Sequence, residues 1–110
     1  MKVTTLNDPQ GLEAVNGTSL KGYVVATRSE LEKALGAPTW NTPSPDGKIT
    51  TEWVLRFSDD TVATIYDWKR YEEGAPEMDE RIEWHIGGHT NEVLLSVERC
   101  LGIASRGWRI

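Results

Sequence analysis

Hydrophobic and polar positions alternate most regularly in the middle of the chain, over residues 51–57. This period of two is typical of a strand with one buried face. Residues 58–60, Ser-Asp-Asp, can turn the chain into a second alternating run over residues 61–68, so the two runs predict an antiparallel hairpin. In the first run, Trp53 and Leu55 are expected to lie between the sheet and the helices. In the second run, one face is formed by Val62, Thr64 and Tyr66, and the other by Ala63 and Ile65.

A third alternating run, over residues 82–86, predicts another strand. Two glycines end this run, and a helical pattern follows at once. Either His89 or Thr90 can cap the helix, and Gly102 ends it. The predicted inner face of the helix consists of Val93, Leu94, Val97 and Leu101.

An earlier helix is indicated by a capping box. Thr27 can accept a hydrogen bond from the amide of Glu30, whose carboxylate reaches back to the amide of Thr27. Gly36 ends this helix. Residues 23–26, YVVA, are a brief β-prone run, and the polar residues 1–22 are expected to form an N-terminal arm or one short strand.

Together these patterns predict an α+β fold. The order of elements is helix, strand, strand, strand, helix (α-β-β-β-α). This order favours an antiparallel sheet of three to four strands with both helices packed on one face. A chain of 110 residues fits one domain, so residues 23–110 are expected to form a single domain after the arm.

The chain is acidic, with a formal net charge of −5. This charge argues against binding to nucleic-acid backbones, which require a concentrated basic surface. The charge is also uneven, because residues 70–83 hold six carboxylates and two arginines, whereas residues 99–110 hold three arginines and no acidic side chain. Such asymmetry permits association into a homo-oligomer.

Targeting signals are not expected in this chain. No apolar run approaches the roughly 20 residues that span a bilayer, and the first residues lack the apolar stretch of a signal peptide. Cys100 is the only cysteine, so no internal disulfide can form. These features predict a cytoplasmic protein that does not bind a membrane.

The first candidate site is the glycine junction, residues 86–90 (IGGHT). A helix N-terminus offers free amides, and glycines let a ligand approach the backbone closely. Gly87, Gly88 and the amides of His89 and Thr90 can thus hold a phosphate or carboxylate. The alternative is that a strand-to-helix corner requires glycine for its backbone conformation alone. The other fixed positions of a Walker loop or dinucleotide motif are missing.

The second candidate site is the segment IYDWKR, residues 65–70, which holds two aromatic rings, a carboxylate and two cations. Lys69 and Arg70 can supply countercharge to a ligand that stacks on Tyr66, Trp68 or Trp84. The alternative is that the rings pack in the sheet while the charged groups stay in water. Both candidate sites lie near strand ends and can meet in space.

Signatures of metal binding and catalysis are incomplete. His85 and His89 have a spacing found among zinc ligands, but the glycines between them disfavour a helical register. Cys100 lies near the inner edge of a predicted amphipathic helix, where a free cysteine behaves as a small hydrophobe. We therefore expect no metal, no cofactor and no enzymatic activity, with a small hydrolase using His85 or His89 as the alternative.

The segments DGKITTEW, DDTVATIYDWK and EWHIGGH resemble a pattern in small proteins of unassigned function encoded by bacteriophages. The likeness covers approximately Tyr23 to Leu101 and is most specific in ATIYDWK and WHIGG. It implies a binding task in the host cytoplasm, such as blocking a defence protein or sequestering a nucleotide signal. The helix ending at LGAP, followed by a strand meander, also resembles the small lipoprotein fold of outer-membrane assembly factors. That likeness bears on the fold alone, because a signal peptide and a lipidated cysteine are not expected here.

Three functional hypotheses follow. The first is a phage-type counter-defence protein that binds and sequesters a phosphate-bearing nucleotide without catalysis. The second is a protein–protein inhibitor of a host defence enzyme, using exposed tryptophans or the carboxylate-rich residues 70–83, here called the acidic loop. The third is a small hydrolase. The predicted ligand-binding residues are Tyr66, Asp67, Trp68, Lys69, Arg70, Trp84, His85, Gly87, Gly88, His89 and Thr90.

Overall fold

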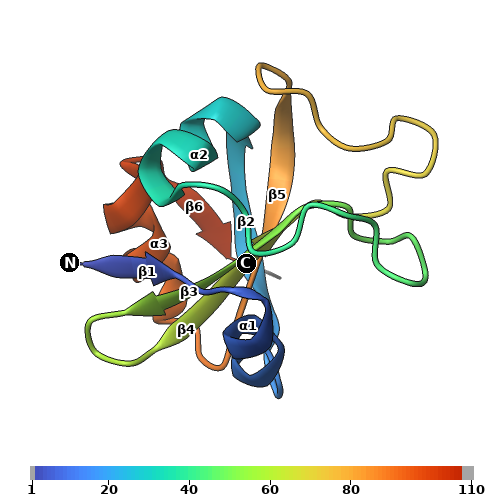
Figure 1. The fold of residues 1–110 in the computed structure, drawn as a ribbon. Coiled ribbons are helices and arrows are strands. Elements are labelled where there is room, and N and C mark those ends of the chain that lie inside the picture. Colours follow the sequence, from blue (N-terminus) through green and yellow to red (C-terminus); the bar gives the residue numbers. More distant parts are fainter. Residues whose placement is uncertain (1, 108–110) are drawn as a thin grey trace.

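The computed structural model describes residues 2–107, and within them one six-stranded antiparallel sheet packs with three helices (Figure 1). The α+β class is confirmed, but the sheet has more strands and the fold more helices than the sequence predicted. The strand order across the sheet is β1-β3-β4-β5-β2-β6. In chain order the elements are β1 (Val3–Thr5), α1 (Asp8–Ala14), β2 (Ser19–Thr27), α2 (Arg28–Leu35), β3 (Glu52–Phe57), β4 (Val62–Tyr66), β5 (Arg81–Gly88), α3 (Val93–Leu101) and β6 (Ser105–Gly107). Arg109 of the predicted basic tail lies outside the described residues.

Helices α2 and α3 lie on one side of the sheet and bury the main core between them and the strands (Figure 1). The predicted hairpin forms its centre, because β3 pairs with β4 and places Trp53 opposite Ile65. Trp53 and Leu55 are completely buried, as predicted. The buried side chains of this core are Val24, Ala26, Leu31, Leu35, Trp53, Leu55, Phe57, Ala63, Ile65, Trp84, Ile86, Val93 and Val97.

Two tryptophans meet at the middle of the main core. The rings of Trp53 and Trp84 form an edge-on pair with centroids 5.5 Å apart. Each buried indole N–H requires an acceptor. Trp53 donates to the carbonyl of Gly36 at 2.9 Å, and Trp84 donates to the carbonyl of Ala26 at 3.0 Å. Trp84 is therefore a core residue, which corrects the expectation that it stacks on a ligand.

The two predicted helices differ in how they begin. Helix α2 starts with the predicted capping box between Thr27 and Glu30. Helix α3 starts only at Val93, with Glu92 at the N-cap and no side-chain cap, so neither His89 nor Thr90 caps it. None of the helices described in residues 2–107 is long and apolar enough to cross a membrane.

Of the two expectations for the N-terminal residues, an arm or one short strand, the structure shows the strand, β1, and adds a helix and the start of β2. Strand β1 pairs with β3, and β2 already starts at Ser19. Between them, α1 begins at a capping box in which Asn7 accepts from the Gln10 amide and the Gln10 side chain accepts from the Asn7 amide. Helix α1 packs near a second, smaller core on the opposite face of the sheet. This core contains Leu6, Val54 and Val62, with Ala14, Val15 and Trp40 packed against it.

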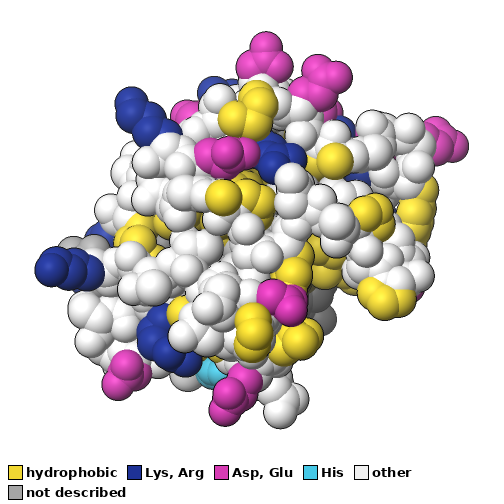
Figure 2. All heavy atoms as spheres, viewed as in Figure 1, with side chains coloured by type: hydrophobic (Ala, Val, Ile, Leu, Met, Phe, Trp, Pro, Cys, Tyr) yellow, Lys and Arg dark blue, Asp and Glu magenta, His cyan; other side chains and the backbone are white. Residues whose placement is uncertain are grey.

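Two long loops, residues 41–51 and 67–80, leave the sheet at the same end (Figure 1). Asp67 joins them. Its buried carboxylate accepts hydrogen bonds from the amides of Thr50 and Thr51 and from the hydroxyl of Thr50. Figure 2 shows hydrophobic side chains gathered on this loop side of the molecule, with charged groups spread more widely.

Candidate functional site

A row of polar and aromatic side chains crosses five strands on the face of the sheet opposite the main core. The register places Tyr66 of β4 between Glu52 of β3 and His85 of β5. Tyr23 of β2 follows His85, and Arg106 of β6 completes the row. Side chains that are directly opposed on neighbouring strands lie close enough to interact. The sheet thereby assembles residues that are far apart in the sequence.

We call Tyr23, Tyr66, Trp68 and His85 the aromatic platform. The ring of His85 contacts the other three, with centroid distances of 5.1 Å to Tyr23, 5.3 Å to Tyr66 and 5.6 Å to Trp68. It stacks on Trp68 with an interplanar angle of 24°, whereas both tyrosines meet it edge-on. Trp68 is 39% exposed, so the platform offers aromatic surface to a ligand.

Cationic side chains border this platform. The Nζ atoms of Lys48 and Lys69 lie 5.8 Å and 5.7 Å from the ring centroid of Trp68, and the guanidinium of Arg106 lies 5.7 Å from that of Tyr23. The backbone holds the two lysines together, because the amide of Lys69 donates to the carbonyl of Lys48 at 2.7 Å. Lys69 has a φ of 54°, which is uncommon for a residue other than glycine. The loop geometry therefore sets where both ammonium groups lie.

The surroundings of His85 favour its neutral form. Burial lowers the pKa of His85, while the charges of Glu83 and Asp67 act in the opposite direction. Its Nδ1 atom is enclosed and has no hydrogen-bond partner within the described chain. Protonation would leave a buried N–H donor at this position without an acceptor. The positive charge at the platform is therefore supplied by the two lysines, because Arg106 already forms an ion pair with Glu83.

Tyr66 provides a hydroxyl group at the platform. Burial raises the pKa of Tyr66 to about 12, with smaller contributions from Glu52 and Tyr23. The hydroxyl therefore stays protonated at neutral pH and can donate a hydrogen bond to an anionic acceptor.

The structure assembles four of the predicted binding residues at the platform, namely Tyr66, Trp68, Lys69 and His85. Sequence reasoning did not identify Tyr23, Lys48 and Arg106. The alternation in β4 and β5 already placed Tyr66 and His85 on faces opposite to their hydrophobic neighbours. The missing signal was strand order, because Tyr23 and Arg106 reach the row only through the pairing of β2 with β5 and β6.

Gly87 and Gly88 are the last two residues of β5 and do not lie at a helix N-terminus, since α3 begins only at Val93. This corrects the predicted glycine junction. Both pair with β2 on one side and β4 on the other, so their backbone groups face neighbouring strands. A Cβ on Gly87 would lie 2.6 Å from Oγ1 of Thr64, and one on Gly88 would lie 2.7 Å from Cγ2 of Val93. Close packing on the two faces of the sheet therefore accounts for both glycines.

Two further predicted residues stabilise loops. Asp67 is fully buried and bound to the threonines of the neighbouring loop. Arg70 donates to the carbonyl of Gly74 at 2.9 Å and forms an ion pair with Glu80 at 2.7 Å. Their hydrogen-bonding groups are thus already engaged within the protein.

The last two predicted residues, His89 and Thr90, are exposed in the turn between β5 and α3. Three residues lie between His85 and His89, and a step of four residues along an extended chain spans about 13 Å. The two histidines therefore belong to different surroundings. No group of three or more His, Cys, Asp or Glu side chains within residues 2–107 is arranged to hold a metal ion.

Cys100 packs against the main core from α3, and burial raises the pKa of its thiol. A raised pKa keeps the group in its less reactive thiol form.

Comparison of the chain with protein-family models, curated proteins and solved structures gives no match. The geometry of the chain itself is therefore the basis for assigning its function.

Proposed function

We propose that the protein binds a phosphate-bearing nucleotide at the aromatic platform and retains it without catalysis. The observation that carries this proposal is the position of two ammonium groups, those of Lys48 and Lys69, within 6 Å of the exposed Trp68 ring. A nucleotide combines an aromatic base with a polyanion. The platform supplies the complementary pair of groups.

The base would stack on the exposed aromatic surface, because every nucleobase has a flat apolar face. Its phosphates would lie against the ammonium groups, where charge-assisted hydrogen bonds are shorter and stronger than neutral ones. The protonated hydroxyl of Tyr66 is a further donor. In an otherwise acidic chain, these cations also favour one orientation of the anion, with its phosphates away from the surface carboxylates.

Binding without turnover is favoured by what surrounds the platform histidine. A catalytic general base is a proton acceptor that is oriented by a hydrogen-bond partner. The Nδ1 atom of His85 has no such partner among residues 2–107. Cys100 lies on α3, which covers the other face of the sheet. Sequestration of a nucleotide signal, as the resemblance to bacteriophage proteins implies, requires affinity and no chemical step.

Calorimetric titration with ATP, adenosine and inorganic phosphate tests this proposal. ATP should bind more tightly than either part alone. Replacing both lysines (Lys48→Ala with Lys69→Ala) should weaken ATP binding about tenfold, since two exposed charge contacts are lost. Lys33→Ala makes the same chemical change at one exposed residue of α2 and should have no effect on ATP binding.

Mass spectrometry of the ligand released by denaturation should return ATP unchanged. The proposal fails if the wild-type protein binds no nucleotide at millimolar concentration. It also fails if Lys33→Ala weakens binding as much as the paired substitution does.

A second candidate function, inhibition of a host enzyme, is favoured by the ordered acidic loop. The two contacts of Arg70, to Gly74 and Glu80, hold this loop in shape. It presents Tyr71, which is 61% exposed, and Met78, which is 47% exposed, among its carboxylates. Exposed aromatic and methionine side chains are enriched at protein interfaces.

Replacing both apolar residues (Tyr71→Ser with Met78→Ser) separates the two functions. If the loop binds a host enzyme, this variant should lose inhibition of that enzyme and keep its ATP affinity. Equal inhibition by variant and parent would exclude the loop as the inhibitory surface.

A further inference from the structure

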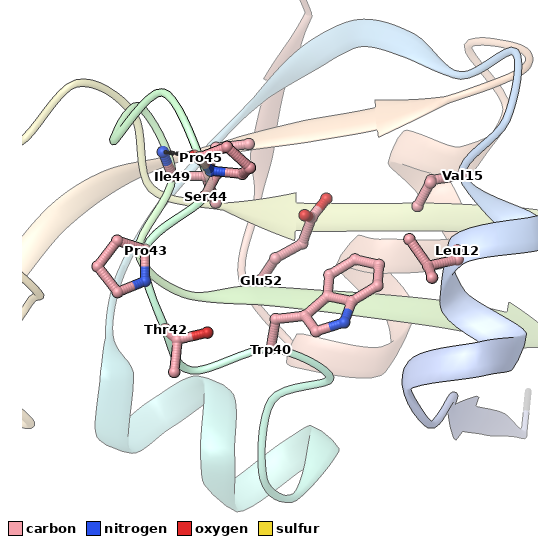
Figure 3. A pocket seen from close by; sticks show the side chains of 9 residues that line it. All are labelled: Leu12, Val15, Trp40, Thr42, Pro43, Ser44, Pro45, Ile49 and Glu52. Carbon is pink, nitrogen blue, oxygen red and sulfur yellow. Dashed lines mark hydrogen bonds between the residues drawn. The ribbon is translucent and has the colours of Figure 1, made fainter.

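A cavity lies beside the row of polar residues, on the same face of the sheet as α1. Its volume is about 380 Å³, at the small end of the range found for ligand pockets. Figure 3 shows Leu12 and Val15 on one side and the proline-rich loop on the other. Its apolar lining consists of Leu12, Val15, Trp40, Pro43, Pro45 and Ile49.

The walls of this cavity are held by specific contacts. Trp40 and Glu52 exchange two backbone hydrogen bonds, of 3.0 Å and 2.9 Å. The indole N–H of Trp40 donates to Asp8 at the start of α1. Gly11 lets the helix approach, because a Cβ there would lie 2.9 Å from Cγ2 of Thr39 and 3.2 Å from Cη2 of Trp40. The cavity is therefore formed before any ligand enters.

In the part of the chain that the structure describes, one charged side chain lines this cavity. The carboxyl group of Glu52 rises from β3 into the space between Trp40 and the loop (Figure 3). Within the described chain, no residue donates a hydrogen bond to it. Burial, followed by the charge of Asp67, raises the pKa of Glu52 to about 7. An ionised carboxylate without a donor in apolar surroundings is costly, and a cationic donor would offset that cost.

We propose that this cavity binds a small organic ammonium ion with an apolar body. The ammonium group donates to Glu52, and the body packs against Leu12, Val15 and Ile49. The ring of Trp40 lies beside the same space and favours a cation over a neutral group. Among residues 2–107, no lysine or arginine lines the cavity, so an anion finds no countercharge there. Charge therefore separates this site from the platform, which is bordered by cations.

Three aromatic compounds of similar size and different charge test the proposal. They are phenethylamine, 2-phenylethanol and phenylacetate, titrated at a pH above 7 so that Glu52 is ionised. The readout is the NMR shift of the Trp40 indole N–H. Phenethylamine should bind about tenfold more tightly than the alcohol, because a hydrogen bond to a charged group is added. Phenylacetate should bind most weakly.

Glu52→Gln keeps the shape of the side chain and removes its charge. This variant should bind the amine and the alcohol equally. Glu13→Gln, which removes an exposed carboxylate of α1 that does not line the cavity, should retain the preference for the amine. Equal binding of all three compounds by the wild type would overturn the proposal. So would an unchanged preference in Glu52→Gln, or amine binding that leaves the Trp40 signal unmoved. ATP binding at the platform is measured separately, so either proposal can fail alone.

Discussion

At the scale of single residues, Glu52 and Asp67 show how surroundings determine the behaviour of a carboxyl group. Asp67 is fully buried and accepts three hydrogen bonds from Thr50 and Thr51. Glu52 points into an apolar cavity and accepts none from the described residues. Burial without donors disfavours its charged form and raises its pKa to about 7. The first carboxylate stabilises the loops, and the second is free to meet a ligand.

Glu52→Gln should remove a pH dependence of stability. The pKa of Glu52 is about 7 in the folded protein, against an ordinary value of 4.5. Below pH 4.5 the group is protonated in both states. As the pH rises towards 7, the unfolded state releases the proton first. The stability of the folded state therefore falls by up to about 3 kcal/mol. Urea denaturation below, within and above this pH window should show that the free energy of unfolding of the variant rises relative to that of the wild type as the pH increases. Parallel stability curves for the two proteins would contradict the assigned surroundings.

Asp67→Asn should weaken the connection between the two long loops. The change removes a charged acceptor of three hydrogen bonds, which should cost about 1–3 kcal/mol of stability. Lys48 and Lys69 lie on these loops, so ATP affinity should fall as well. Chemical denaturation and calorimetry measure the two effects. Asp79→Asn changes an exposed carboxylate of the loop of residues 67–80 and serves as the control.

At the scale of elements, the contact between β5 and α3 explains why glycine ends the strand. Gly88 lies against Val93, the first residue of α3. This contact lets the helix pack directly on the sheet. The same absence of a side chain that suggests an anion site in the sequence here permits close packing of two elements.

Gly88→Ala should destabilise the protein by about 1–3 kcal/mol, because its Cβ would lie 2.7 Å from Cγ2 of Val93. Adding Val93→Ala removes the obstructing atoms. The double variant should therefore be more stable than the sum of the two single effects predicts. Thermal denaturation of all four proteins measures this coupling. Strictly additive effects would show that the contact does not limit the packing.

At the scale of the whole molecule, one sheet serves two purposes with its two faces. The face towards α2 and α3 buries the main core around Trp53 and Trp84. The opposite face holds the smaller core under α1, the aromatic platform and the Glu52 cavity. The main core and the proposed binding groups are therefore placed on different sides. Substitution of an exposed platform residue such as Trp68 should affect stability little.

Trp53→Ala tests this separation. Truncating a completely buried tryptophan should cost about 3–5 kcal/mol, a large share of the stability of a small domain. Trp68→Ala makes the same chemical change at a residue that is 39% exposed and should cost much less. It should instead abolish ATP binding. If the two variants have the same melting temperature, the assignment of the two faces is wrong.

Local patterns in the sequence determine several elements of this protein. The period of two predicts the β3–β4 hairpin and the burial of Trp53, and the Thr27–Glu30 capping box predicts the start of α2. The capping box at Asn7 and Gln10 was also present in the sequence and marks α1. These features depend on residues that are neighbours in the chain, so the local sequence is enough to predict them.

Only the tertiary structure decides what the glycines, tryptophans and carboxylates do. Pairing of β2 with β5 and β6 brings Tyr23 and Arg106 to His85. Packing of α1 and the proline-rich loop around Glu52 creates the cavity that raises its pKa. Strand order and burial arise from contacts between residues distant in the chain. Alternation specifies which face a side chain occupies, but not which strand lies beside it or what covers it.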